Sequence, residues 1–103
     1  MNIKDFIKGW IVGDFEPSIL KTKDIEIGLK YYKKGQIDEE HYHKIITEYT
    51  IIVYGKVKML DNVYSDGDIV KIVPLQTNRF ECVEDACVLV IKTPSITDDK
   101  YII

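Results

Sequence analysis

Short strand-like segments separated by turn residues run through most of this sequence, and they constrain its fold more than any other feature. Apolar residues alternate with other residues over 25–32, which is the period-two pattern of a half-buried strand. Similar or β-branched-rich runs occupy residues 48–54, 56–59 and 69–73. Roughly seven such runs, with turn signals every eight to twelve residues, predict an all-β sandwich or barrel.

The chain has the length of a single small domain. Its 103 residues can enclose one modest core but not two. We expect one domain over residues 1–103, with a barrel core at about 25–92, a short N-terminal segment and a C-terminal arm. Helical spacing occurs only over residues 2–9, which is too short for a stable isolated helix.

Charge and hydropathy exclude two classes of partner. The net charge is -3 and basic and acidic residues are interspersed, so no basic face is predicted to bind nucleic acid. The apolar runs are much shorter than the roughly 18 residues that span a bilayer, so we expect no membrane insertion. The N-terminus lacks the apolar stretch of a secretory signal, and the expected location is the cytoplasm.

The two cysteines, Cys82 and Cys87, allow two interpretations. If Glu84 and Asp85 form the turn of a hairpin between residues 79–83 and 86–92, the cysteines lie opposite each other and a disulfide is geometrically possible. Otherwise they are two small buried apolar side chains in a reducing compartment.

One group of residues has the chemistry of a metal site. His41 and His43 are two residues apart in a strand, so both imidazoles project from one face. Glu48 follows after four residues, enough for a reversal that brings its carboxylate toward them. Two imidazoles and one carboxylate suit a divalent transition metal: Fe(II), with Mn, Ni, Co or Zn also possible.

These residues resemble a known motif. Gly35, the triplet His41-Tyr42-His43, Glu48 and Gly55 have the spacing of the first motif of the cupin superfamily. The resemblance implies a cupin-type β-barrel, also called a jelly roll, with His41, His43 and Glu48 as metal ligands.

The second cupin motif is only partly present. Gly67 matches it, but Asn78 stands where the family has its fourth ligand, a histidine. Asn78 and Gln76 are therefore candidates for a fourth metal ligand or for contacts to a bound molecule. An asparagine carbonyl is a poorer ligand for Zn or Fe than an imidazole, so catalysis is in doubt.

Three functions fit these observations. The first is a metal-dependent enzyme acting on a small polar metabolite, and the second is a binding module without a metal that holds a sugar or another small ligand. The third is a metal-free scaffold that uses only its surface. Cupins often pair as dimers, so we expect a homodimer. The residues do not decide whether the protein is an enzyme.

Overall fold

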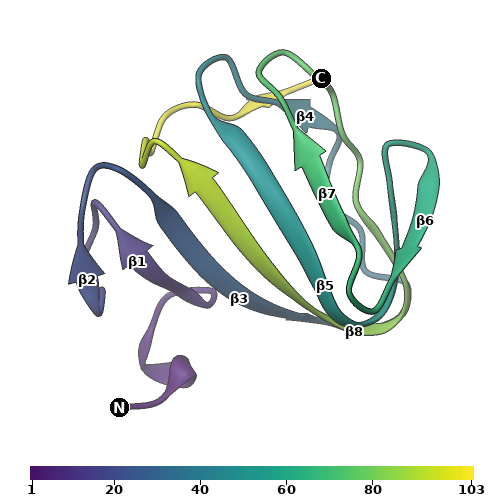
Figure 1. The fold of residues 1–103 in the computed structure, drawn as a ribbon, viewed down its shortest axis with the longest axis horizontal. Helices are drawn as coiled ribbons and strands as arrows, with labels where there is room; N and C mark the ends of the chain where they lie inside the picture. Colours follow the sequence, from purple (N-terminus) through teal and green to yellow (C-terminus); the bar gives the residue numbers. More distant parts are fainter.

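Apart from one short 3-10 turn, the regular secondary structure of the protein consists of strands (Figure 1). The computed structural model describes residues 1–103. Its elements are one 3-10 turn, η1 (Ile3–Asp5), and the strands β1 (Trp10–Gly13), β2 (Leu20–Lys21), β3 (Glu26–Tyr32), β4 (His41–Tyr42), β5 (Thr47–Met59), β6 (Asn62–Ser65), β7 (Ile69–Ile72), β8 (Glu81–Thr93) and β9 (Tyr101–Ile102). The predicted all-β class is confirmed. None of its elements is a helix of the length and apolar character that crossing a membrane requires.

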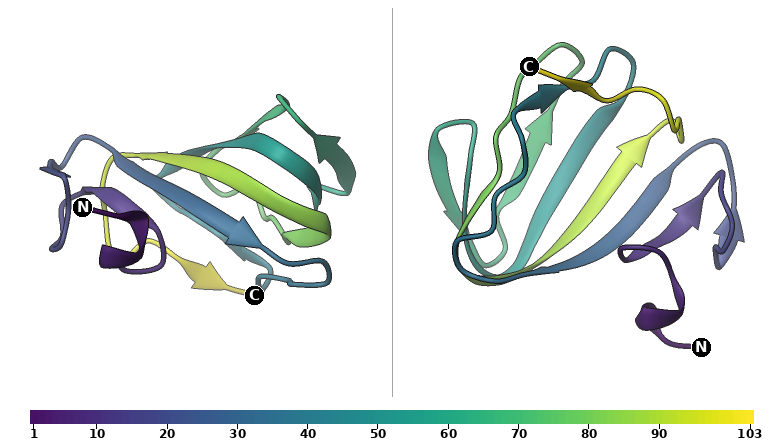
Figure 2. Two further views of the ribbon diagram at one scale, coloured as in Figure 1. Left: turned by 90° about the horizontal axis from the view of Figure 1, so that it is seen from below. Right: turned by 180° about the vertical axis from the view of Figure 1, so that it is seen from behind.

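Seven strands form one strongly curved sheet, and β4 and β9 form a separate two-stranded sheet. In the large sheet the order is β2-β1-β3-β8-β5-β6, and β7 also pairs with β5. The pairing of β5 with β8 shifts register near Gly55, whose φ of +96° only glycine adopts readily. This bend curls both long strands, so that the sheet wraps around an interior (Figure 2).

The other wall of the barrel is irregular chain. The segment after β3 runs antiparallel to the segment before β8, with bridges between Ile37 and Glu81 and between His41 and Asn78. A tight turn at Ser65–Asp68, in which the Asp68 N–H donates to the Ser65 carbonyl at 2.9 Å, connects β6 to β7 as the sequence predicts.

The predicted hairpin around Glu84 and Asp85 is wrong. Residues 81–93 form one continuous strand, β8, and both acidic residues are exposed on it. The Asp85 carboxylate accepts a hydrogen bond of 2.8 Å from the backbone N–H of Lys34, so it fastens the strand to a neighbouring loop. Cys82 and Cys87 consequently lie on the same strand as free, buried thiols, as the second interpretation expects of their side chains.

Both ends of the chain pack on the barrel. β1 extends the sheet beside β3, and the Trp10 indole lies over Gly28, where any Cβ would come within 2.7 Å of the indole. At the C-terminus β9 pairs with β4 of the same chain, and the rings of Tyr42 and Tyr101 stack at 5.3 Å between centroids. The C-terminal arm is therefore docked on its own barrel.

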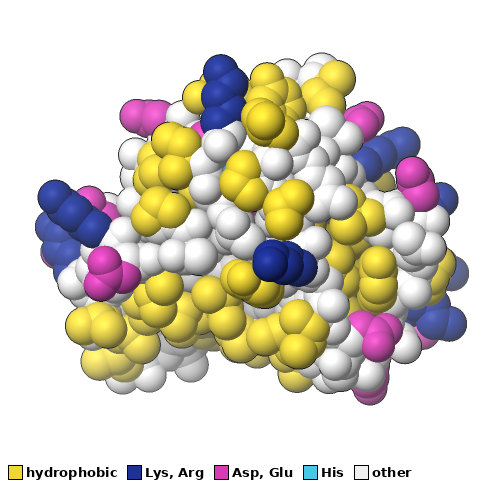
Figure 3. Space-filling view, turned by 45° about the horizontal axis from the view of Figure 1, so that its top comes forward, with side chains coloured by type: hydrophobic (Ala, Val, Ile, Leu, Met, Phe, Trp, Pro, Cys, Tyr) yellow, Lys and Arg dark blue, Asp and Glu magenta, His cyan; other side chains and the backbone are white.

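The core lies on the concave side of the sheet. It consists of ten buried residues: Ile52, Val57, Met59, Val70, Ile72, Phe80, Cys82, Ala86, Val88 and Val90. Hydrophobic side chains also gather on the outer surface (Figure 3). Val53 and Ile69, on the paired strands β5 and β7, are both exposed. The expected homodimer stays a prediction.

Candidate functional site

A cavity of about 320 Å³ opens inside the barrel, and we call it the barrel cavity. Its walls come from β3, β5 and β8 on one side and from the irregular wall on the other. The polar residues that line it are Lys8, Lys30, Tyr32, Asp38, His41, Glu48, Thr50, Asn78, Lys92 and Lys100. The five that lie on the large sheet, Lys30, Tyr32, Glu48, Thr50 and Lys92, alternate with residues on its outer face, as strand geometry requires.

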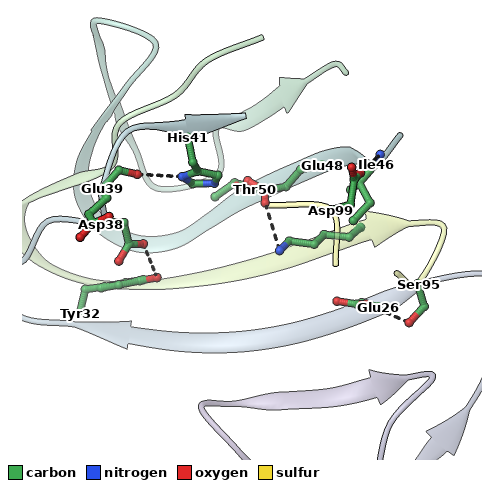
Figure 4. Close-up of polar contacts among 11 residues, drawn as sticks. Glu26, Tyr32, Asp38, Glu39, His41, Ile46, Glu48, Thr50, Ser95 and Asp99 are labelled. Carbon is green, nitrogen blue, oxygen red and sulfur yellow. Dashed lines mark hydrogen bonds and ion pairs between the residues drawn. The ribbon is translucent and has the colours of Figure 1, made fainter. Parts of the chain in front are cut away.

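His41 is held in the cavity wall by its backbone and by its ring. Its N–H and carbonyl both bond to the backbone of Asn78, at 3.0 and 2.9 Å. Nδ1 lies 2.8 Å from the Glu39 carbonyl oxygen, and since a carbonyl can only accept, Nδ1 carries the hydrogen (Figure 4). In the neutral ring Nε2 is then left as an acceptor.

Glu48 forms an ion pair inside the cavity. Glu48 and Lys92 are direct partners across β5 and β8, and their charged groups lie 3.9 Å apart. Both side chains are largely buried, with exposures of 12% and 17%. The Thr50 hydroxyl donates to the other Glu48 oxygen at 3.3 Å. An ammonium group thus already compensates the carboxylate that the sequence assigns to a metal.

Lys30 carries a second positive charge in the same cavity. Its Nζ lies 4.3 Å from the centre of the Trp10 ring, and Nζ of Lys92 lies 4.8 Å from it. Burial, reinforced by the charge of Lys92, lowers the pKa of Lys30 from 10.5 to about 8. The Trp10 ring stabilises both cations, but no carboxylate lies within ion-pairing distance of Lys30.

Tyr32 and Asp38 complete the polar lining. The Tyr32 hydroxyl donates to the Asp38 carboxylate at 3.4 Å (Figure 4). Burial, followed by the negative charge of Asp38, raises the pKa of Tyr32, so the phenol stays protonated at neutral pH.

His43 lines a different space. A second cavity of about 310 Å³, which we call the end cavity, lies between the N-terminal segment and the C-terminal arm. Trp10, Lys92 and Lys100 line both cavities. The ring of His43 lies 5.2 Å from that of His41, edge to face, and only 4% of the residue is exposed. Burial, reinforced by Lys92 and His41, lowers its pKa from 6.5 to about 4.

Both candidate fourth ligands already accept a hydrogen bond through the side-chain oxygen. The Asn78 side-chain oxygen accepts the N–H of Leu60 at 3.0 Å, so it ties two irregular segments together. The Gln76 side-chain oxygen accepts the N–H of Val73 at 3.1 Å within a turn, and Gln76 lines neither cavity.

These donors are not gathered into a metal-binding group in this structure. No three His, Cys, Asp or Glu side chains converge closely enough to hold a metal ion. His41 and Glu48 share the barrel cavity, but His43 lines the end cavity and Glu48 is paired with Lys92. The metal site predicted from the sequence stays a prediction. Sequence reasoning missed Lys30, Lys92 and Trp10. For Lys30 the reason is that alternation over residues 25–32 assigns the apolar residues to the buried face, whereas the structure turns Lys30 and Tyr32 into the cavity.

Comparisons with known proteins agree on the fold. No family model matches the sequence, and no curated protein matches it significantly. The structure is similar to an uncharacterized conserved protein with a double-stranded β-helix domain from Klebsiella pneumoniae, at a TM-score of 0.75 and 14% identity over 99% of this chain and 88% of that one. KdgF from a Halomonas species gives a TM-score of 0.68 and 20% identity over 75% of this chain and 74% of that one.

A third similar structure is oxalate decarboxylase from Bacillus subtilis, which has Mn(II) centres. Its TM-score is 0.67 at 18% identity, over 80% of this chain and 25% of that one. Identities this low carry the fold and not the activity. With its curved sheet, its two closing segments and these similarities, the protein has the double-stranded β-helix fold of the cupins.

Proposed function

We propose that this protein binds a small polar anion, such as a hydroxylated carboxylate or a sugar phosphate, in its barrel cavity. The observation that carries the proposal is the largely buried positive charge of Lys30, which has no ion-pair partner. Four lysines line the cavity against two carboxylates, Asp38 and Glu48. A bound anion beside Lys30 would favour its protonated form and offset the cost of its burial.

The remaining lining suits the polar body of such a ligand. The Thr50 hydroxyl and His41 Nε2 supply hydrogen-bonding groups around the lysines. Phe80 and Val90 supply an apolar floor. A volume of about 320 Å³ is at the lower end of ligand pockets, which favours a metabolite over a larger molecule.

Metal-dependent chemistry, predicted from the sequence, is the competing candidate. In its favour, His41 and Glu48 line one cavity and the two imidazoles lie 5.2 Å apart. Against it, Glu48 would have to leave Lys92 before it could bind an ion. The same fold is found in a manganese protein, but that likeness concerns the fold alone.

The test is a calorimetric titration with gluconate and glucose 6-phosphate, and with neutral glucose as the matched control ligand. We expect the anions to bind more tightly than glucose, and their affinity to fall as the pH rises through about 8, where Lys30 loses its charge. Lys30→Met should abolish the preference, whereas Lys71→Met, at an exposed lysine, should leave it unchanged. Equal binding of glucose and gluconate would contradict the proposal.

A metal assay separates the competing candidate. Protein purified without an affinity tag is expected to hold less than about 0.1 equivalent of any transition metal, also after reconstitution. Stoichiometric metal that is lost in both His41→Ala and Glu48→Gln would favour metal chemistry over the anion site.

A further inference from the structure

The end cavity differs in character from the barrel cavity. Its interior surface is formed mainly by the apolar side chains of Ile7, Trp10, Phe15, Ile46 and Ile96. The charged or polar Glu16, Thr97 and Lys100 are exposed at its rim. The cavity therefore has a mainly apolar interior and a polar, solvent-exposed entrance, which is the usual construction of a small-molecule site.

His43 is the one buried polar side chain of this cavity whose polar atoms have no partner in the protein. The residue is 4% exposed, yet neither ring nitrogen makes a hydrogen bond within the chain. No fully enclosed side-chain nitrogen or oxygen in the structure lacks a partner, so the unpaired nitrogens of His43 must reach the cavity. Water can reach these nitrogens through the cavity, and a bound molecule that displaces this water must supply a hydrogen bond in its place.

The other buried polar groups at this cavity are already engaged. The Asp99 carboxylate accepts the backbone N–H groups of Lys44, Ile45 and Ile46 at 2.8 to 3.0 Å. Glu26 accepts the Ser95 hydroxyl at 2.9 Å (Figure 4), and Lys92 is paired with Glu48. Among the buried polar groups of this cavity, only His43 is left to form a hydrogen bond with a bound molecule.

The size of the cavity narrows the ligand class. An apolar cavity of about 150 Å³ is enough to bind benzene. The end cavity, at about 310 Å³, has room for about two fused rings. We infer that the end cavity is a second binding site, independent of the anion site, for a flat apolar molecule of about two rings with one hydroxyl group that hydrogen-bonds to His43.

The test compares 2-naphthol with naphthalene, which lacks only the hydroxyl, on protein treated with EDTA. Binding is followed by calorimetry and by the NMR signals of the two histidine rings. We expect 2-naphthol to bind about 3 to 10 times more tightly than naphthalene, the worth of one hydrogen bond, and to shift the ring signals of His43. In His43→Leu this difference should disappear while naphthalene still binds.

Two further variants keep the inference falsifiable. Ile96→Trp fills the cavity and should exclude both compounds, even if His43→Leu proves unable to fold. Lys30→Met lies in the barrel cavity and should leave naphthol binding intact, so failure of the anion site and failure of this site give different results. Equal affinities for the two compounds, or binding that Ile96→Trp does not reduce, would overturn the inference.

Discussion

Acid destabilisation through His43 gives a prediction that can be worked out in full. In the unfolded chain a histidine has a pKa near 6.5, whereas burial keeps that of His43 at about 4 in the folded protein. Between these two values the unfolded state binds one more proton than the folded state. The stability contributed by the neutral ring is thus complete above about pH 6.5, falls as the pH decreases, and is fully lost at about pH 4.

The magnitude follows from the two pKa values. Linkage gives a loss of about 2 kcal/mol in the free energy of unfolding between pH 7 and pH 5 from this one residue. Carboxyl groups, among them that of Asp99, also titrate at low pH and change the stability of the protein there. Burial alone would raise the pKa of Asp99, but the N–H groups of Ile46, Ile45 and Lys44 hold it below its ordinary value. The contribution of His43 must therefore be taken as a difference between proteins.

The assay is urea unfolding at pH 7 and pH 5 in the presence of EDTA, followed by the fluorescence of Trp10. We expect His43→Leu to lose about 2 kcal/mol less than the wild type over this interval. His41→Leu, which keeps His43, serves as the matched control and should retain the loss due to His43. Parallel losses in the wild type and in His43→Leu would refute the reasoning.

Three further changes test the packing. Ile52 is fully buried, so Ile52→Ala should lower the free energy of unfolding by about 2–5 kcal/mol. Val53 is 49% exposed, so Val53→Ala should lower it by less than about 0.5 kcal/mol. Equal effects of the two changes in urea unfolding would contradict the assigned core. Gly28→Ala places a methyl group 2.7 Å from the Trp10 indole. It should lower the free energy of unfolding by about 1–3 kcal/mol and shift the tryptophan emission. Unchanged emission would show that the indole does not lie over the glycine. Burial raises the pKa of the Cys82 and Cys87 thiols, so a thiol reagent should label the native protein far more slowly than the unfolded chain; equally rapid labelling would mean that β8 opens in the native state.

Much of the barrel could be predicted because strand patterns are local. Alternation over residues 25–32 gave β3 within one residue, and the turn at Ser65–Asp68 lies where its polar residues predict it. The hairpin at Glu84 failed for a physical reason. A bend in a long strand exposes polar residues just as a turn does, and the sequence alone does not distinguish the two.

The candidate site was less predictable because its decisive contacts are distant in sequence. The spacing of His41 and Glu48 placed them in one cavity, but Lys92 reaches Glu48 only through the register of β5 against β8. The end cavity needs residues from the N-terminal segment, the middle of the chain and the C-terminal arm. No local sequence pattern indicates that these three distant segments lie together.

The position of β8 also determines when this protein can fold. It lies between β3 and β5 in the sheet and is their shared partner, yet it is synthesised after both of them. β3 and β5 do not pair with each other, so each lacks a neighbour along one edge until β8 arrives. On the ribosome the two strands must therefore wait, each with one exposed edge, until β8 has been synthesised.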